Sequence, residues 1–106
     1  SFFYPHKNLK PSWFGFPILL DAKYIRKKEK FLNFLNKNRV ETRPIISGNF
    51  VNQPAINLYN ISYNLKELHN SKQIDKRGFF IGLPTTKLSD IVVKKLAELL
   101  LKVSKI

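Results

Sequence analysis

The polar residues that follow Arg43 are the group whose types and spacing best suit chemistry with a ligand. A turn of sequence Ser47-Gly48-Asn49 comes after Arg43, and Gln53 follows shortly. The arginine can form forked, charge-assisted hydrogen bonds, while hydroxyl and amide groups add neutral donors and acceptors. We therefore predict that a polyhydroxylated or phosphorylated ligand binds to Arg43, Ser47, Gly48, Asn49 and Gln53. The alternative is a loop whose Asn and Gln side chains satisfy their own backbone.

Groups that commonly act in catalysis are scattered along the chain. Its two histidines, His6 and His69, lie in different segments without the spacing of metal ligands, which argues against a zinc site or a histidine-based triad. Cysteine is absent, so thiolate metal sites, disulfides and cysteine nucleophiles are excluded. The seven carboxylates form no evident pair, and the four glycines form neither a P-loop nor a dinucleotide-binding motif. We predict no catalytic residue, no cofactor-binding residue and no metal ligand within this chain.

The composition is that of one small, basic, folded domain. The chain has 106 residues, of which 43% are hydrophobic, and its net charge is +12. The basic residues are mostly lysines spread along the sequence, with one cluster at residues 26–30. They fit either a solvated surface or a face that binds phosphate groups. No apolar run approaches the roughly 20 residues that cross a bilayer, so we expect a cytoplasmic protein. The start at Ser1, without methionine, is interpreted as a cut edge.

The elements that must position the candidate residues alternate between strands and helices. We expect a strand at Trp13–Leu20 and an amphipathic helix at 23–38, preceded by Asp21 as its N-cap. A second strand is expected at Val40–Ile46. Pro44 should confine that strand to the edge of the sheet, because proline cannot donate a ladder hydrogen bond.

The second half of the chain begins with a long loop and ends in a helix. The loop runs from Ser47 to about Leu65 and contains a turn of helix, and loops of this length in compact domains are usually functional. A short helix is expected at 71–77, a third strand at Phe79–Leu83 and a final amphipathic helix after Ser89, which caps it. This order predicts an α+β domain whose small sheet is covered on one face by helices.

Several stretches resemble the small domain of the DegT/DnrJ/EryC1/StrS family of fold-type I pyridoxal phosphate (PLP) enzymes. Residues 11–17 resemble the strand that opens that domain, and residues 40–44 resemble its Thr-Arg-Pro strand. Ser47-Gly48-Asn49-Phe50 with Gln53-Pro54 is similar to a signature of the family's sugar 3-dehydratase branch, and residues 70–84 resemble the segment running into the last strand. The resemblance covers about residues 10–103. It implies a mostly antiparallel three-stranded sheet.

The resemblance also implies a function for the enzyme to which such a domain belongs. The chain would be the C-terminal small domain of a PLP-dependent nucleotide-sugar aminotransferase or 4-keto-6-deoxysugar 3-dehydratase of surface-polysaccharide or deoxysugar biosynthesis. The large domain, with the PLP-binding lysine or the histidine that replaces it, is absent, so the isolated chain is expected to be inactive. Expected partners are the nucleotide sugar, the large domain and, when the enzyme is complete, a second subunit. Neither a membrane nor nucleic acid is expected.

Two other functions stay open. The chain could be a basic nucleic-acid-binding module. Lys27, Lys28 and Lys30 would then contact the phosphate backbone of the nucleic acid, and aromatic residues such as Tyr4 would stack on its bases. It could also be a stand-alone interaction domain. If a large domain covers this one, the aromatic residues of the N-terminal segment and of the first strand should lie exposed. Arg43 has its own alternative, a salt bridge to Glu41 or to a helix carboxylate.

Overall fold

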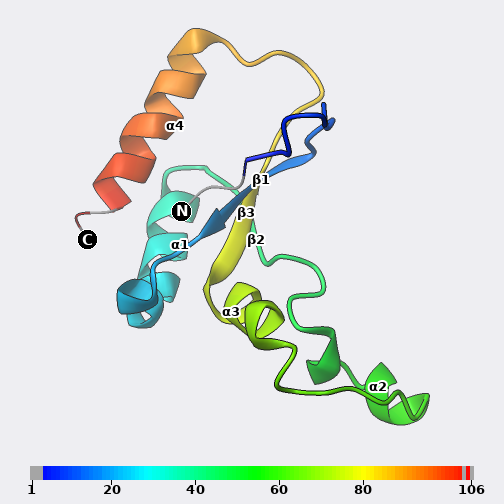
Figure 1. The fold of residues 1–106 in the computed structure, drawn as a ribbon. Helices are drawn as coiled ribbons and strands as arrows, with labels where there is room; N and C mark the ends of the chain where they lie inside the picture. The colour runs from blue at the N-terminus through cyan, green and yellow to red at the C-terminus, as the bar shows by residue number, and fades with distance from the viewer. Residues whose placement is uncertain (1–3, 104, 106) are drawn as a thin grey trace.

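Three antiparallel strands form the sheet at the centre of the protein, whose computed structural model describes residues 4–103 and 105. The strands are β1 (Gly15–Leu19), β2 (Thr42–Arg43) and β3 (Gly78–Gly82), in the spatial order β1-β3-β2. Figure 1 shows that the last strand in the sequence lies between the other two. The predicted α+β class, with a small antiparallel sheet and helices, is confirmed.

The helices lie at the positions that the sequence pattern predicts, with shifted ends. They are α1 (Lys28–Lys37), α2 (Ala55–Leu58), α3 (His69–Arg77) and α4 (Asp90–Val103). A 3₁₀ helix, Ala22–Lys27, precedes α1, so the predicted helix at 23–38 consists of two parts. Asp21 starts it through its backbone carbonyl, which accepts the Tyr24 N–H at 2.9 Å, and not through a side-chain cap.

All three strands lie where they were predicted; the first two predictions are too long, and the third is shifted by one residue. The predicted strand Val40–Ile46 contributes only Thr42 and Arg43 to the ladder, because Pro44 has no N–H to donate. It is an edge strand, as Pro44 predicts.

At the other end of the chain, the Val92 N–H donates to Ser89 Oγ at 3.4 Å, which confirms the predicted cap of α4.

The hydrophobic core lies on one face of the sheet, beneath α1 and α4. The register places Phe79 and Ile81 of β3 on the same face as Ile18 of β1. Phe31 and Leu35 of α1 and Leu99 and Val103 of α4 pack against this face. Phe31, Phe79 and Leu35 are the largest fully buried side chains among the described residues. The core therefore fixes α1 and α4 against the central strand, as the prediction of one helix-covered face requires.

The opposite face is built around Phe80. The Phe80 ring lies so close to Gly15 that any Cβ at position 15 would collide with it. The Phe14 ring packs edge-on against the Phe80 ring, with 5.5 Å between the two ring centroids. Arg43 pairs with Phe80 in the register and therefore shares this face. In Figure 1, α3 lies at the end of the sheet where β3 begins, far from α4.

Aromatic side chains are exposed where the N-terminal segment meets β1. Tyr4 is 85% exposed, Phe14 76% and Trp13 45%, as expected of a surface that another domain covers. Phe16 of β1 differs from this expectation, because it is partly buried and packs against the core. Phe2 and Phe3, which belong to the same expectation, lie outside the described residues. None of the helices in the described part of the chain has the length and apolarity needed to cross a membrane.

Candidate functional site

Arg43 is presented by the edge strand β2, on the face of the sheet opposite the core. Its side chain is paired with Glu41: Nη2 lies 2.7 Å from Oε1, and Nε donates to the same oxygen at 2.8 Å. The structure thus shows the alternative anticipated for Arg43. Both side chains are more than half exposed, and an exposed ion pair contributes only about 0–1 kcal/mol. A ligand phosphate could therefore replace Glu41 at little cost.

The Ser47–Asn49 turn leaves the sheet near the start of β3 and lies against α3. Gly48 has a φ angle of 64°, in the left-handed region that favours glycine. A Cβ on Gly48 would collide with the Asp75 carboxylate of α3. The same carboxylate accepts a hydrogen bond from Asn52 Nδ2 at 3.0 Å. Asp75 therefore lies against the turn at Gly48 and is bonded to Asn52 just after it, a role that sequence analysis did not assign to it.

Asn49 is the buried member of the candidate set. It is 5% exposed, and its Oδ1 has no hydrogen-bond partner among the described residues. Its backbone carbonyl accepts the Asn52 N–H at 3.0 Å and starts the 3₁₀ helix Phe50–Asn52. Leaving a buried acceptor unpaired costs about 1–3 kcal/mol, so such atoms usually meet a water or a ligand donor. Asn49 Oδ1 bonds to no backbone group among the described residues, so this oxygen does not satisfy the loop's own backbone.

Lys28, the first residue of α1, connects this core helix to α3. Its Nζ donates to the backbone carbonyls of Asp75 at 3.3 Å and of Lys76 at 3.2 Å, at the C-terminal end of α3. Burial lowers the pKa of Lys28 below its usual 10.5, and the charge of Asp75 offsets part of that decrease. Sequence analysis placed Lys28 in a surface cluster. The contact between Lys28 and α3 joins residues far apart in the chain, so no local sequence pattern predicts it.

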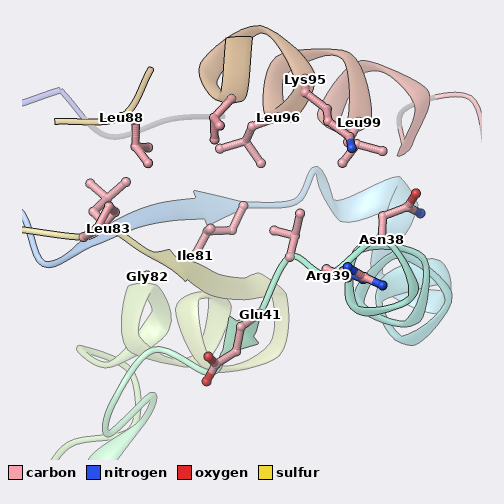
Figure 2. A pocket seen from close by; sticks show the side chains of 13 residues that line it. Asn38, Arg39, Glu41, Ile81, Gly82, Leu83, Leu88, Lys95, Leu96 and Leu99 are labelled. Carbon is pink, nitrogen blue, oxygen red and sulfur yellow. The ribbon is translucent and has the colours of Figure 1, made fainter. Parts of the chain in front are cut away.

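A groove of about 600 Å³ lies between α4 and the β2–β3 side of the sheet. Figure 2 shows Leu96 and Leu99 of α4 facing Ile81 across it. Its lining is mostly apolar, and none of the five candidate ligand-binding residues lines it. Glu41, the partner of Arg43, does line it, so the ion pair stands at the border of the groove. The sequence signal for this groove is the apolar stripe of α4 together with Leu83 and Leu88.

The candidate residues form two separate parts. Among the described residues, no hydrogen bond or ion pair joins Arg43 to the turn. Arg43 is tied to Glu41, whereas the turn is tied to α3. Within the same described part of the chain, no three Asp, Glu or His side chains lie close enough to hold a metal ion. The arrangement can offer one cation and several amide groups, which suits binding and orientation of a polar ligand.

Comparison with known proteins finds clear relatives. No protein-family model matches the chain. It is 36% identical over 92 residues to the lipopolysaccharide biosynthesis protein RfbH of Salmonella typhimurium, covering 83% of this chain and 21% of that protein. It is 33% identical over 104 residues to the dTDP-4-dehydro-2,6-dideoxy-D-glucose 3-dehydratase of Saccharopolyspora spinosa, covering 94% of this chain and 22% of that protein. The chain thus spans about one fifth of the length of these relatives.

Solved structures agree with the sequence comparison. A crystal structure of GDP-4-keto-6-deoxymannose-3-dehydratase with a trapped PLP-glutamate geminal diamine matches with a TM-score of 0.66 and 28% identity. The E. coli enzyme with bound hydrated PLP matches with a TM-score of 0.63 and 30% identity. Each match covers 82% of this chain and 22% of the solved chain. The fold is therefore one that occurs as a part of larger chains.

Proposed function

We propose that this chain, whose homologues are nucleotide-sugar 3-dehydratases and RfbH, is the C-terminal small domain of a PLP-dependent enzyme of deoxysugar biosynthesis. The observation that carries the proposal is the match of 94% of the chain to one fifth of a sugar 3-dehydratase. The names of the relatives favour a 3-dehydratase over an aminotransferase. The substrate of the enzyme would be a nucleotide-linked keto sugar. The enzyme would belong to the DegT/DnrJ/EryC1/StrS family.

PLP would supply the electron sink for this chemistry from outside the residues described here. The described residues do not fit the cofactor. Lys28, the lysine whose pKa is lowered, is bonded to carbonyls of α3, and the groove beside α4 is mostly apolar. The role proposed for this domain is to bind and orient the substrate.

Within that role, each candidate residue has a chemical task. Arg43 would exchange Glu41 for a phosphate or sugar oxygen of the nucleotide sugar, in a forked geometry that lysine cannot copy. The unpaired Oδ1 of Asn49 would accept a hydrogen bond from a sugar hydroxyl after a small opening of the turn. Ser47 and Gln53 are exposed on either side of it and would add further polar contacts. Gly48 would let the turn form.

Replacing Arg43 by lysine in the complete enzyme tests this assignment. A charge-assisted hydrogen bond contributes roughly 1.5–3 kcal/mol, so Arg43→Lys should raise KM for the nucleotide sugar about tenfold or more. The absorbance spectrum of bound PLP should stay the same. Arg26→Lys, at an exposed position of the 3₁₀ helix, is the matched control and should leave KM unchanged. An unchanged KM with a lowered melting temperature would show that Arg43 has a structural role.

The position of Lys28 weakens the nucleic-acid alternative. Lys28 is turned toward α3 and partly buried, so it is not available to a phosphate backbone. Tyr4 is 85% exposed and could still stack on a base. This function stays a prediction, and salt-dependent binding of the chain to single-stranded oligonucleotides would support it.

A further inference from the structure

Two cations lie at one end of the groove between α4 and the sheet. Figure 2 shows Arg39 and Lys95 at this end, beside the end of α1, whereas Leu83 and Leu88 lie at the opposite end. Among the described residues, neither cation forms an ion pair. The groove is therefore apolar along most of its length and positively charged at one end.

The end of α1 does not require the Arg39 side chain. The Phe34 carbonyl accepts a hydrogen bond from Asn38 Nδ2 at 2.8 Å, and the Leu35 carbonyl accepts the Val40 N–H at 3.0 Å. Carbonyl groups at the end of a helix often pair with a basic side chain, but these two have other partners. The Arg39 guanidinium is therefore available to a ligand.

The backbone of Arg39 also points to a role in binding. Its φ angle of 62° lies in the left-handed region, which is unfavourable for most residues with a Cβ. The other described residues with a positive φ are Gly48 and Asn60, whose residue types tolerate this conformation better. Residues in unfavourable backbone conformations cluster at active sites and ligand-binding sites. The chain thus keeps an arginine at the groove at some cost to its stability.

The size and lining of the groove fit a small amphiphilic molecule. Its volume of about 600 Å³ falls within the range of about 300–1,000 Å³ that is typical of small-molecule sites. Glu41 is the one carboxylate among the described residues that line it. Its charge is paired with Arg43, and Figure 2 shows it away from the two cations. An anionic group is therefore favoured at the end that carries the cations.

We propose that this groove binds a single-chain anionic amphiphile. The carboxylate or phosphate head contacts Arg39 and Lys95, with forked hydrogen bonds from the guanidinium. The aliphatic tail lies over Leu96 and runs toward Leu83 and Leu88, where the burial of each methylene group adds to the affinity. None of the candidate residues for the nucleotide sugar takes part, so the proposal does not depend on the proposed enzymatic function.

NMR titration of the 106-residue chain with octanoate, octyl phosphate and 1-octanol tests the proposal. Both anions should saturate one site and shift the amide signals of Arg39 and Leu96. Octanol keeps the tail but has no charge, and should bind about tenfold more weakly. Decanoate should bind more tightly than octanoate, about two- to fourfold for each added methylene group. Either anion may bind the more tightly of the two, and both orders support the proposal.

Substitutions at the charged end test the contact with the head group. Lys95→Gln should weaken octanoate binding about threefold to tenfold and leave octanol binding unchanged. Lys94→Gln is the matched control, because Lys94 is the neighbouring residue of α4 and does not line the groove. Arg39→Gly should weaken octanoate binding similarly and raise the melting temperature, because glycine relieves the left-handed backbone. A purely structural role for Arg39 would leave octanoate binding unchanged.

A pair of substitutions on α4 tests the path of the tail. Val92 lines the groove and Val93 does not, and their exposed fractions are similar, at 48% and 50%. Val92→Asp should weaken the binding of all three ligands about tenfold, because it places a charge beside the tail, whereas Val93→Asp should have little effect. Circular dichroism checks that every variant is folded. The proposal is overturned if no ligand saturates below its micelle-forming concentration, if octanol binds as tightly as octanoate, or if the control variants behave like the groove variants.

Discussion

Replacing Gly48 by alanine should weaken the turn that carries the candidate site, for two reasons that can be measured separately. The first is the backbone: a φ of 64° costs a residue with a Cβ roughly 1–2 kcal/mol. The second is Asp75, whose carboxylate occupies the space of the new methyl group and must swing away. That movement breaks the hydrogen bond from Asn52 Nδ2, which contributes about 1 kcal/mol at this exposed position.

The total expected loss in the free energy of unfolding is therefore about 2–3 kcal/mol. Asp75→Ala removes the carboxylate in advance and leaves the Asp75 Cβ, at 3.3 Å from the new methyl group, as a tight neighbour. In that background Gly48→Ala should cost only the backbone part, about 1–2 kcal/mol. The difference between the two backgrounds, about 1 kcal/mol, is the coupling energy of a double-mutant cycle.

Urea unfolding of the four proteins measures the cycle, and hydrogen exchange of the Asn52 amide reports on the turn itself. That amide donates to the Asn49 carbonyl and should exchange faster in Gly48→Ala. Equal costs in both backgrounds would show that the Asp75 contact contributes nothing. A neutral Gly48→Ala in the wild-type background would show that the turn does not adopt the left-handed conformation.

Two further predictions concern stability. Leu35 is 0% exposed in the core, so Leu35→Ala should lower the free energy of unfolding by about 2–5 kcal/mol in urea titrations, whereas Ile91→Ala on the surface of α4 should change it by less than about 0.5 kcal/mol. Burial lowers the pKa of Lys28 in the folded state, so between this lowered pKa and 10.5 the Lys28 side chain binds more protons in the unfolded chain than in the folded one. The free energy of unfolding should therefore rise with pH up to 10.5. Relative to Lys28→Met, the wild type should therefore gain stability between neutral pH and 10.5, and a constant difference would contradict the burial of its charge.

Local sequence patterns predicted most of the fold. The apolar spacing of α4 and its Ser89 cap, the restriction that Pro44 places on β2, and the position of β3 all follow from rules that act within a few residues. The strand ends were less predictable, because pairing depends on the partner strand. Val40–Ile46 looks extended throughout, yet β3 accompanies it only at Thr42 and Arg43.

The candidate residues were chosen from the sequence and stay a prediction, whereas the contacts that support them were not predictable from it. Arg43, Gly48 and Asn49 stand out by type and spacing. Asp75, which is bonded to Asn52, and Lys28, which is bonded to α3, reach these partners across 23 and 47 positions of sequence. Contacts of that kind are set by the packing of α3 against the rest of the domain. The burial of Asn49 likewise follows from this packing, since its residue type favours exposure.

The central position of β3 dictates when this domain can fold during synthesis. Gly15 pairs with Gly82 and Thr42 pairs with Ile81, so both edge strands wait for residues 78–82 before they gain a hydrogen-bonded neighbour. Pairings of such wide separation in sequence form slowly, because the intervening chain must be closed first. Until β3 and then α4 leave the ribosome, Ile18 and Phe31 have no complete core to enter. During that interval these apolar side chains stay uncovered, and the net charge of +12 opposes association of nascent chains.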